Sequence, residues 1–278
     1  MTAAALPDTR PRFTDLLAAE WIKTRSLRST YWMLALSALV ALAININAVR
    51  TDLPYIDHPP AQAPGMPPYS YDPLWHGLGS IAASVMGLAA ACFGAITVFG
   101  EYATGMVRTT FAAVPDRRGV VTAKVVLVTM VCLVLGTAVS LTSFLTTNAM
   151  LASRGIGLSL SDEGCLRAVA GYALGVPVCA LVGMAFGAVL RHATASIVGV
   201  VGLLFVLPMV FGGERYRWLK EIGNHLPLAA ESRLALNPHT TATLGEYPPT
   251  VPGAWIALAA WALVSAVVTV AVVRRRDV

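Results

Sequence analysis

The segment from Gly100 to Lys124, GEYATGMVRTTFAAVPDRRGVVTAK, places a cluster of charges between two long uncharged runs. The charged residues of this segment are Glu101, Arg108, Asp116, Arg117, Arg118 and Lys124. Apolar side chains, Phe111 among them, lie between the charges. An apolar anchor with arginines at its rim is typical of a surface that binds another protein. The chemistry expected of this segment is therefore recognition.

Patterns for catalysis, nucleotide binding and metal binding are absent from the sequence. It has no G-x-x-x-x-G-K-[ST], no H-E-x-x-H and no G-x-S-x-G. The four cysteines are spaced neither as a disulfide framework nor as a metal knuckle. The five histidines lie far apart. We therefore expect neither an enzyme nor a metal site, and no cofactor bound by this chain itself.

The composition indicates a membrane protein. Hydrophobic residues make up 56% of the 278 residues and charged residues only 13%, whereas a soluble domain carries about 25% charged residues. The mean hydropathy is +0.66. The net charge of +5 arises from basic residues at the ends of apolar runs. This pattern is typical of membrane topology and excludes a nucleic-acid partner.

Six stretches are long enough, at about 20 residues each, to cross the bilayer as helices. They cover about residues 30–49, 75–99, 125–150, 168–190, 193–211 and 254–273. We therefore predict an all-α integral membrane protein, with residues 1–278 forming a single transmembrane domain of six helices.

Basic residues set the expected orientation. Thirteen of the 20 Lys and Arg residues fall on the side that carries both termini and residues 100–124. Positively charged loops face the cytoplasm. We therefore expect a multi-pass protein of the plasma membrane with both termini and the 100–124 connector in the cytoplasm. Residues 212–252 form the longest extracellular loop, for which we expect one or two short helices at the outer interface.

Residues 10–28 precede the first span and have the pattern of an amphipathic helix. Phe13, Leu17 and Trp21 recur at helical spacing, and Lys23 and Arg25 follow them. One interpretation is a helix in the plane of the inner leaflet, with its basic residues at anionic headgroups. The other is a cytoplasmic helix packed on the protein.

Small residues at intervals of four predict close helix packing. The relevant glycines are Gly79 and Gly87 in the second span, and Gly171, Gly175, Gly183 and Gly187 in the fourth. Their spacing leaves open whether the partner is another span of this chain or a second subunit.

The middle of every predicted span lacks ionisable side chains. An ion-driven carrier needs such groups at depth, so this class is not predicted. Asn45 and Asn148 lie near the outer ends of the first and third spans, where they can act as helix caps or contact a substrate.

The 100–124 connector has room for one short helix. It leaves the second span at Glu101, turns at Gly105, and is free to form a helix until Pro115 stops it. Two hypotheses remain open. Either Phe111 anchors the connector in a groove of a cytoplasmic partner, or the connector lies on the inner leaflet and its charges only enforce topology.

The order of these features resembles the permease subunit of type-2 ABC transporters, an exporter class. The features are an E-W-x-K helix, a first span opening with STYW, a Glu ending the second span, G-M-V-R-T-T, Pro115, an Arg pair and the six-span layout. The resemblance covers nearly the whole chain. It implies that residues 10–28 form an elbow helix, that residues 100–124 form a coupling segment, and that 212–252 contain a re-entrant hairpin.

The resemblance also implies a function and partners. The chain would line the pathway of an exporter for an amphiphilic, drug-like or lipid-like substrate. Two copies of a cytoplasmic ABC ATPase would bind ATP and Mg²⁺ and dock on the coupling segments, and a second or sister permease would complete the pathway. The coupling residues would be Glu101, Gly105, Arg108, Phe111, Pro115, Arg117 and Arg118. The alternative is a membrane channel or scaffold that needs no ATPase.

Overall fold

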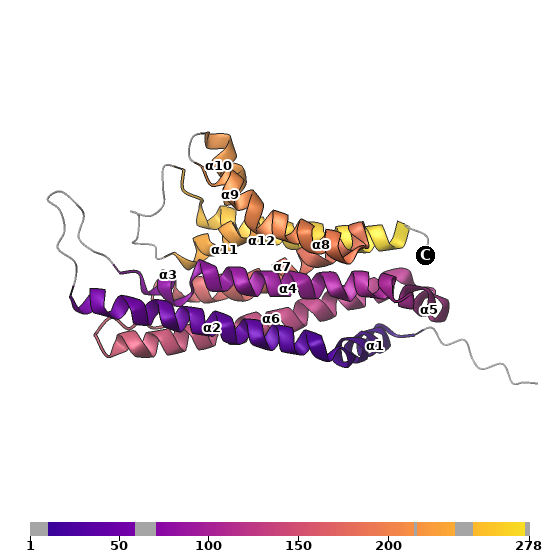
Figure 1. Ribbon diagram of the computed structural model, residues 1–278, viewed down its shortest axis with the longest axis horizontal. Helices are drawn as coiled ribbons and strands as arrows, with labels where there is room; N and C mark the ends of the chain where they lie inside the picture. The colour runs from indigo at the N-terminus through magenta and orange to yellow at the C-terminus, as the bar shows by residue number, and fades with distance from the viewer. Residues whose placement is uncertain (1–10, 59–70, 214–215, 237–246, 276–278) are drawn as a thin grey trace, which may run out of the picture.

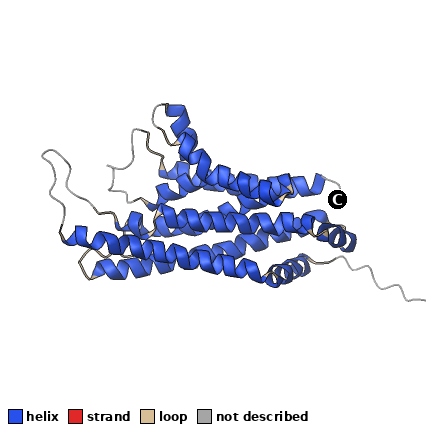
Figure 2. Cartoon of the chain, viewed as in Figure 1, coloured by secondary structure: helices blue, strands red, loops and turns tan. Residues whose placement is uncertain are grey.

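The described residues of the computed structural model are 11–58, 71–213, 216–236 and 247–275, and they fold into helices joined by short connections (Figure 2). Residue 10 of the predicted elbow helix lies outside this range, as do residues 214–215 and 237–246 of the long loop. Figure 2 shows only helices and loops in the described part, in agreement with the all-α prediction.

Six helical segments within the described ranges are long and apolar enough to cross a membrane, which confirms the predicted number. They are α2 (Arg28–Asp57), α3 (Pro73–Gly77) with α4 (Ser80–Ala103), α6 (Arg117–Ala152), α7 (Cys165–Leu190), the segment 193–211, and α12 (Val251–Arg275). Segment 193–211 consists of α8 (Ala193–Val201), a π-helical turn η1 (Gly202–Val206) and α9 (Leu207–Phe211).

Two of these helices run well beyond the predicted spans. Helix α6 begins at Arg117, eight residues before the predicted start at 125, because Asp116 caps it by accepting a hydrogen bond from the Gly119 N–H at 3.0 Å. Helix α2 continues to Asp57. Hydropathy finds the apolar part of a helix, and polar turns at either end can extend it.

The remaining helices lie at the two ends of the bundle. They are α1 (Phe13–Ser26), α5 (Met106–Ala113), α10 (Arg217–Asn224) and α11 (Pro227–Ala235). Figure 1 shows α1, α5 and the C-terminal end of α12 at one end, and α3, α10 and α11 at the other. Helix α1, the C-terminal end of α12 and the charged connector thus share one end of the bundle.

Helices α7 and α4 form the centre. The most apolar window of α7 is 72% buried and that of the α3–α4 segment 61%, whereas the other four segments reach 28% at most. Exposed apolar residues are therefore concentrated on the outer helices, as expected for a bundle whose surround is lipid.

The glycine row of α7 has two partners, and both belong to this chain. A Cβ added to Gly187 would lie 2.8 Å from the Ala95 carbonyl oxygen, and one at Gly183 would overlap the Ala91 carbonyl oxygen. The absence of a side chain at these two glycines therefore allows α4 to pack closely against α7. A Cβ at Gly171 would lie 2.7 Å from Leu234 Cβ, so the N-terminal part of the glycine row allows α11 to pack closely against α7.

The glycines predicted in the second span also pack within the chain. A Cβ at Gly87 would lie 3.1 Å from Cys179 Sγ, and a Cβ at Gly79 would lie 3.4 Å from Asn45 Oδ1. The closest approach on α4 is instead at Gly94, where a Cβ would overlap the Ala180 carbonyl oxygen. Gly94 was absent from the predicted row.

Asn45 joins three helices near the end that carries α3. It is fully buried, its Nδ2 donates to Ser143 Oγ at 2.9 Å, and its Oδ1 accepts from the Gly79 N–H at 3.1 Å. Asn148 Oδ1 likewise accepts from the Leu158 N–H at 2.6 Å. Both asparagines bind backbone N–H groups outside their own helices, and neither caps the helix that carries it, because α2 continues to Asp57 and α6 to Ala152.

The two short helices of the long loop differ in position. Trp218 of α10 is 61% exposed, whereas Ala230 and Leu234 of α11 are fully buried. We predicted interfacial helices in 212–252, and the structure adds that α11 packs against α7, α12 and α4. The cause is tertiary, since Gly171 and Gly175 leave room for α11 on the face of α7.

Candidate functional site

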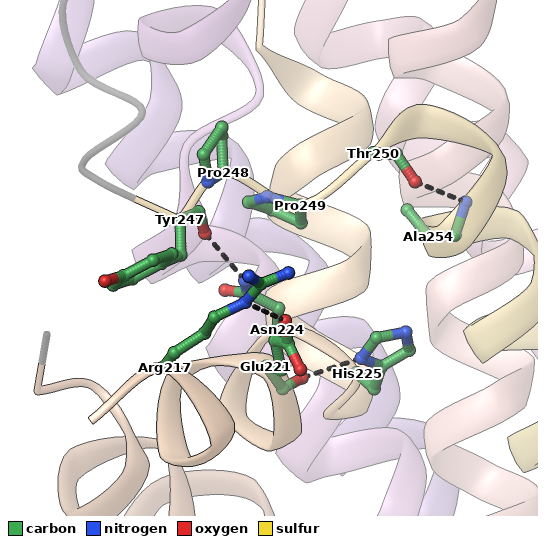
Figure 3. A pocket seen from close by; sticks show the side chains of 10 residues that line it. Arg217, Glu221, Asn224, His225, Tyr247, Pro248, Pro249, Thr250 and Ala254 are labelled. Atoms are coloured by element: carbon green, nitrogen blue, oxygen red, sulfur yellow. Dashed lines mark hydrogen bonds and ion pairs between the residues drawn. The ribbon is translucent and has the colours of Figure 1, made fainter.

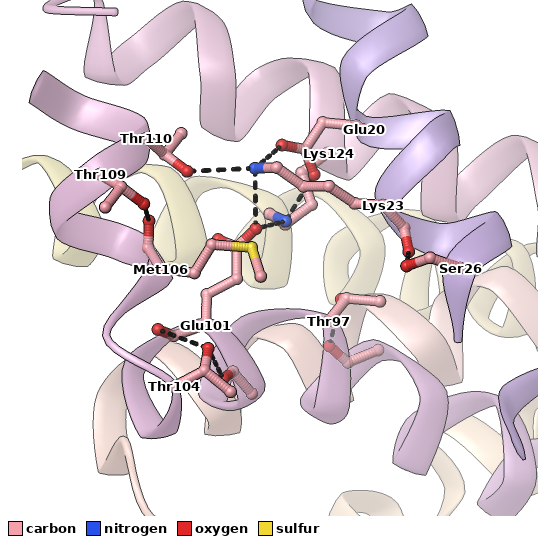
Figure 4. A network of polar contacts seen from close by, with 12 residues as sticks. Glu20, Lys23, Ser26, Thr97, Glu101, Thr104, Met106, Thr109, Thr110 and Lys124 are labelled. Atoms are coloured by element: carbon pink, nitrogen blue, oxygen red, sulfur yellow. Dashed lines mark hydrogen bonds and ion pairs between the residues drawn. The ribbon is translucent and has the colours of Figure 1, made fainter. Parts of the chain in front are cut away.

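Four charged side chains from three helices meet at the end of the bundle that carries α5 (Figure 4). Lys124 Nζ of α6 contacts Glu20 Oε2 of α1 at 2.5 Å and Glu101 Oε1 of α4 at 2.8 Å. Lys23 Nζ of α1 contacts Glu20 Oε1 at 2.7 Å and Glu101 Oε1 at 3.0 Å. We call these four residues the ion network. Each carboxylate contacts both ammonium groups, which makes the network a closed ring.

The helices place these side chains through simple spacing. Glu20 and Lys23 are three residues apart and therefore share one face of α1. Glu101 lies in the last turn of α4, and Lys124 lies in the second turn of α6. The connector between α4 and α6 brings these two residues together, and α1 then closes the ring from the side.

Helix α5 is attached to the same ring. Lys23 Nζ donates to Thr110 Oγ1 of α5 at 3.3 Å. Val107 is 4% exposed, and the partly buried Phe111 packs against the small cluster of Leu16, Val120 and Ala123. The ring thus fastens a short exposed helix to the ends of α1, α4 and α6.

Burial makes the pairing necessary. The side chain of Glu20 is 3% exposed and that of Lys124 is 9% exposed, while Glu101 and Lys23 reach 17% and 26%. A charge removed from water must be paired and hydrogen-bonded to be tolerated. Two positive and two negative charges give a neutral set, so each charge is compensated by the others.

The pKa of Lys23, which lies outside the spanning segments, reflects this compensation. Burial lowers the pKa of the ammonium group, but the hydrogen bond to Glu20 and the charge of Glu101 outweigh this effect and raise the pKa above its ordinary value. Lys23 therefore stays charged throughout the physiological range, and the ring keeps its balance of charges there.

The turn into α5 depends on Gly105. Its φ of 71° lies in the left-handed region, and a Cβ there would meet nothing within 4 Å. The requirement for glycine is thus conformational and not steric. Gly105 donates to the Tyr102 carbonyl at 3.2 Å, and Pro115 lies in the connection after α5, as the sequence predicted.

Phe111 does not project from the protein as the anchor hypothesis expected. Its ring packs on the protein and lies under the Arg117 guanidinium, 5.3 Å from centroid to Cζ. The exposed residues of α5 are Met106, Arg108, Thr109, Ala112 and Ala113. Arg118, at the start of α6, is also exposed. Because α5 has only eight residues and carries apolar groups on more than one face, its buried face could not be predicted from the sequence.

The N-terminal helix has an inward and an outward face. Glu20 and Leu16 are buried, whereas Phe13 and Trp21 are 43% and 44% exposed. Arg25 is exposed, and Leu17 packs partly on the protein. One face of α1 therefore packs on the protein, and exposed apolar residues remain on the other face.

A second candidate lies at the opposite end of the bundle (Figure 3). A cavity of about 460 Å³ separates α10 from the segment that enters α12. Arg217 Nε donates to Glu221 Oε1 at 2.8 Å, Asn224 Nδ2 donates to the Tyr247 carbonyl at 3.0 Å, and His225 Nδ1 lies 2.7 Å from the Glu221 carbonyl. These polar groups are engaged with one another and hold the loop together, so the ion network is the stronger candidate.

Sequence reasoning identified Lys23 and Glu101 as site residues but assigned them to two separate features. The E-W-x-K pattern included Glu20, but the sequence did not predict that the side chain of Glu20 is buried. It also did not predict that Thr110 contacts Lys23. The available signal was the presence of Lys124 and Glu20 next to apolar runs, where an unpaired charge is costly.

Comparison with known proteins identifies no relative. No protein-family model matches the chain, and no curated protein matches it.

Proposed function

We propose that this chain is the permease subunit of an ATP-driven ABC exporter, and that a separate cytoplasmic ATPase moves it by pushing on α5. The observation that carries the proposal is the ion network, which joins α1, α4 and α6 and holds α5 through the hydrogen bond from Lys23 to Thr110. ATP and Mg²⁺ would bind to the ATPase, present in two copies. A second copy of this chain or a sister permease would complete the pathway.

If α5 transmits force from the ATPase, it must be attached rigidly to the spanning helices. A connector whose charges only set the membrane topology needs no such attachment. Charges that merely retain a connector in the cytoplasm need no buried partners. Here Glu20 and Lys124 are nearly inaccessible to water, and breaking such a buried pair costs about 3–5 kcal/mol. The ring would therefore keep the ends of α1, α4 and α6 together when α5, which is attached through Thr110 and the packing of Phe111, is displaced.

The outward face of α5 is suited to a protein partner. Met106 is 42% exposed, and Arg108 of α5 and Arg118 at the start of α6 are exposed as well. An apolar side chain flanked by arginines favours a partner groove with an apolar floor and acidic rim. In the proposed orientation this end of the bundle, with both termini, faces the cytoplasm.

A groove on the outer surface of the bundle is suited to bind an amphiphilic substrate. A shallow groove of about 250 Å³ lies between α7 and α12, and its lining is apolar apart from Ser265. Phe186 and Trp261 contribute aromatic rings to it. A groove of this kind fits an alkyl or aromatic group, as in a lipid or a hydrophobic drug.

The docking test replaces exposed residues of α5 without touching the ion network. We expect Met106→Asp combined with Arg108→Glu to lower the amount of bound ATPase by about tenfold or more, because an apolar anchor and a rim charge are lost together. The measurement is co-purification of an ABC ATPase with the full-length protein, together with the ATP hydrolysis of that complex.

Arg275→Glu is the matched control, because Arg275 is exposed at the same end of the bundle but lies on α12. It should retain the ATPase. The proposal is wrong if the α5 variant retains the ATPase at the wild-type level. Solute transport by the purified chain alone would also overturn it, and would favour the channel alternative.

A further inference from the structure

Glu231 is a buried carboxyl group that the sequence did not reveal, because it lies between two predicted spans. It belongs to α11, is 3% exposed, and rests against Gly175 of α7, where an added Cβ would overlap the carboxyl group. Its Oε1 is buried and has no hydrogen-bond partner in the described part of the chain. The neighbouring Tyr172 hydroxyl is buried and likewise has no partner there.

The basic residues nearest to α11 are occupied elsewhere. Arg167 of α7 donates through Nε to the Leu234 carbonyl and through Nη2 to the Leu236 carbonyl. Arg233 donates through Nε to the Pro249 carbonyl at 2.6 Å. These arginines hold backbone groups at the C-terminal end of α11 and in the chain leading into α12, and no salt bridge joins either of them to Glu231 among the described residues.

The other helices packed on α11 supply no counter-charge. The titratable groups of α7 near Glu231 are Tyr172 and Cys179, and neither residue type can carry a positive charge. The acidic or basic residues of α4 and α12 are Glu101, Arg274 and Arg275, all at the far end of the bundle (Figure 1). On α10, Arg217 and Glu221 pair with each other, and Lys220 lies 3.4 Å from the Gly212 carbonyl.

We propose that Glu231 is a proton-binding site, which takes up one proton from water when α11 seats on α7 and releases it when α11 lifts away. An ionised carboxylate without a partner is far less stable in this position than the neutral acid. The step is the addition of a proton to the carboxylate, with hydronium or water at the α10–α11 end as donor.

The pKa agrees with the geometry. Burial raises the pKa of Glu231 to about 8 from an ordinary value of 4.5. The seated form therefore carries a proton that the open form lacks between about pH 4.5 and 8. Seating is most favourable below this window and becomes less favourable by about tenfold for each pH unit through it, with no further change above pH 8.

Infrared spectroscopy of the full-length protein in lipid nanodiscs tests the proposal directly. At about pH 6.5, where an exposed carboxyl is ionised, the wild type should show a carbonyl band of a protonated carboxyl group. This band should be absent from Glu231→Gln and retained in Glu221→Gln, the matched exposed glutamate. If the band is missing from the wild type, or persists in Glu231→Gln, the proposal is wrong.

Hydrogen exchange gives a second readout that also applies if the glutamine variant folds poorly. After correction for intrinsic rates, the protection of α11 amides in the wild type should fall by about tenfold per pH unit between about pH 6 and 8. Protection that stays constant over this range would overturn the proposal. A folded Glu231→Gln variant should show constant protection, because its side chain does not titrate.

Discussion

Lys124→Met is expected to lower the free energy of unfolding by about 3 kcal/mol, a large fraction of the stability of a protein. The substitution removes one of two positive charges from the ion network and leaves Glu20 buried, with its side chain 3% exposed. The loss lies at the lower end of the range for a broken buried pair, because Lys23 still contacts Glu20 and Glu101. The measurement is thermal unfolding in detergent, where the midpoint should fall by roughly 10 °C.

A second substitution and a change of pH separate charge imbalance from lost packing. Lys124→Met combined with Glu20→Gln restores neutrality and should recover about half of the loss. The single variant has an excess negative charge in the folded state. Protonation of one carboxylate relieves that excess, so the deficit of the variant should shrink as the pH falls below about 5.

Lys220→Met is the matched control, because Lys220 lies at the surface, where its Nζ is 3.4 Å from the Gly212 carbonyl. This change should cost less than about 0.5 kcal/mol. Equal midpoints for the two lysine variants would contradict a structural role for the ion network. The network would then be unsuited to transmit force from α5.

The six spans were predictable because hydrophobicity is a local property. About 20 consecutive apolar residues bury their backbone hydrogen bonds as a helix in lipid whatever the neighbouring helices do. Local hydrophobicity alone predicts the 193–211 span, and it predicts the ends of the other spans within about four residues, except for the end of α2 and the start of α6. The additional turns of α2 and α6 were missed, because a polar turn can end a helix or extend it.

The ion network and Glu231 depend on tertiary contacts that no local pattern encodes. Glu20 and Lys124 are 104 positions apart, so their contact exists only once α1 has packed against α6. Helix α11 reads as polar and interfacial, yet two glycines on α7 give it a buried site. The prediction concerned charged residues in the spans alone, and Glu231 lies outside them, on α11.

The glycine row shows how a pattern can be right while its residues are partly wrong. A strict interval of four exceeds the 3.6 residues of a helical turn, so such a row winds slowly around the helix. Gly87 faces Cys179 and Leu228, but further along α4 the contact with α7 has moved to Gly94, which lies seven residues on. Two helical turns correspond to about seven residues, which is the spacing that the packing follows.

Gly94→Ala is expected to destabilise the protein by about 3 kcal/mol, since overpacking a tight core typically costs 1–3 kcal/mol and a backbone obstacle lies at the upper end. The added Cβ would overlap the Ala180 carbonyl oxygen, which belongs to a helix and cannot rotate away like a side chain. The two most buried helices would have to separate along their length. Thermal unfolding measures the loss.

Gly100→Ala is the control on the same helix, six residues away. A Cβ at Gly100 meets nothing within 4 Å, and alanine favours the helix by up to about 1 kcal/mol over glycine. The two identical substitutions should therefore change stability in opposite directions.

Gly183→Ala, whose Cβ would overlap the Ala91 carbonyl oxygen, disturbs the contact between α4 and α7 from the α7 side. Combined with Gly94→Ala it should cost less than the sum of the two, because the helices are already apart. If Gly94→Ala and Gly100→Ala unfold at the same temperature, α4 and α7 do not approach as closely as described.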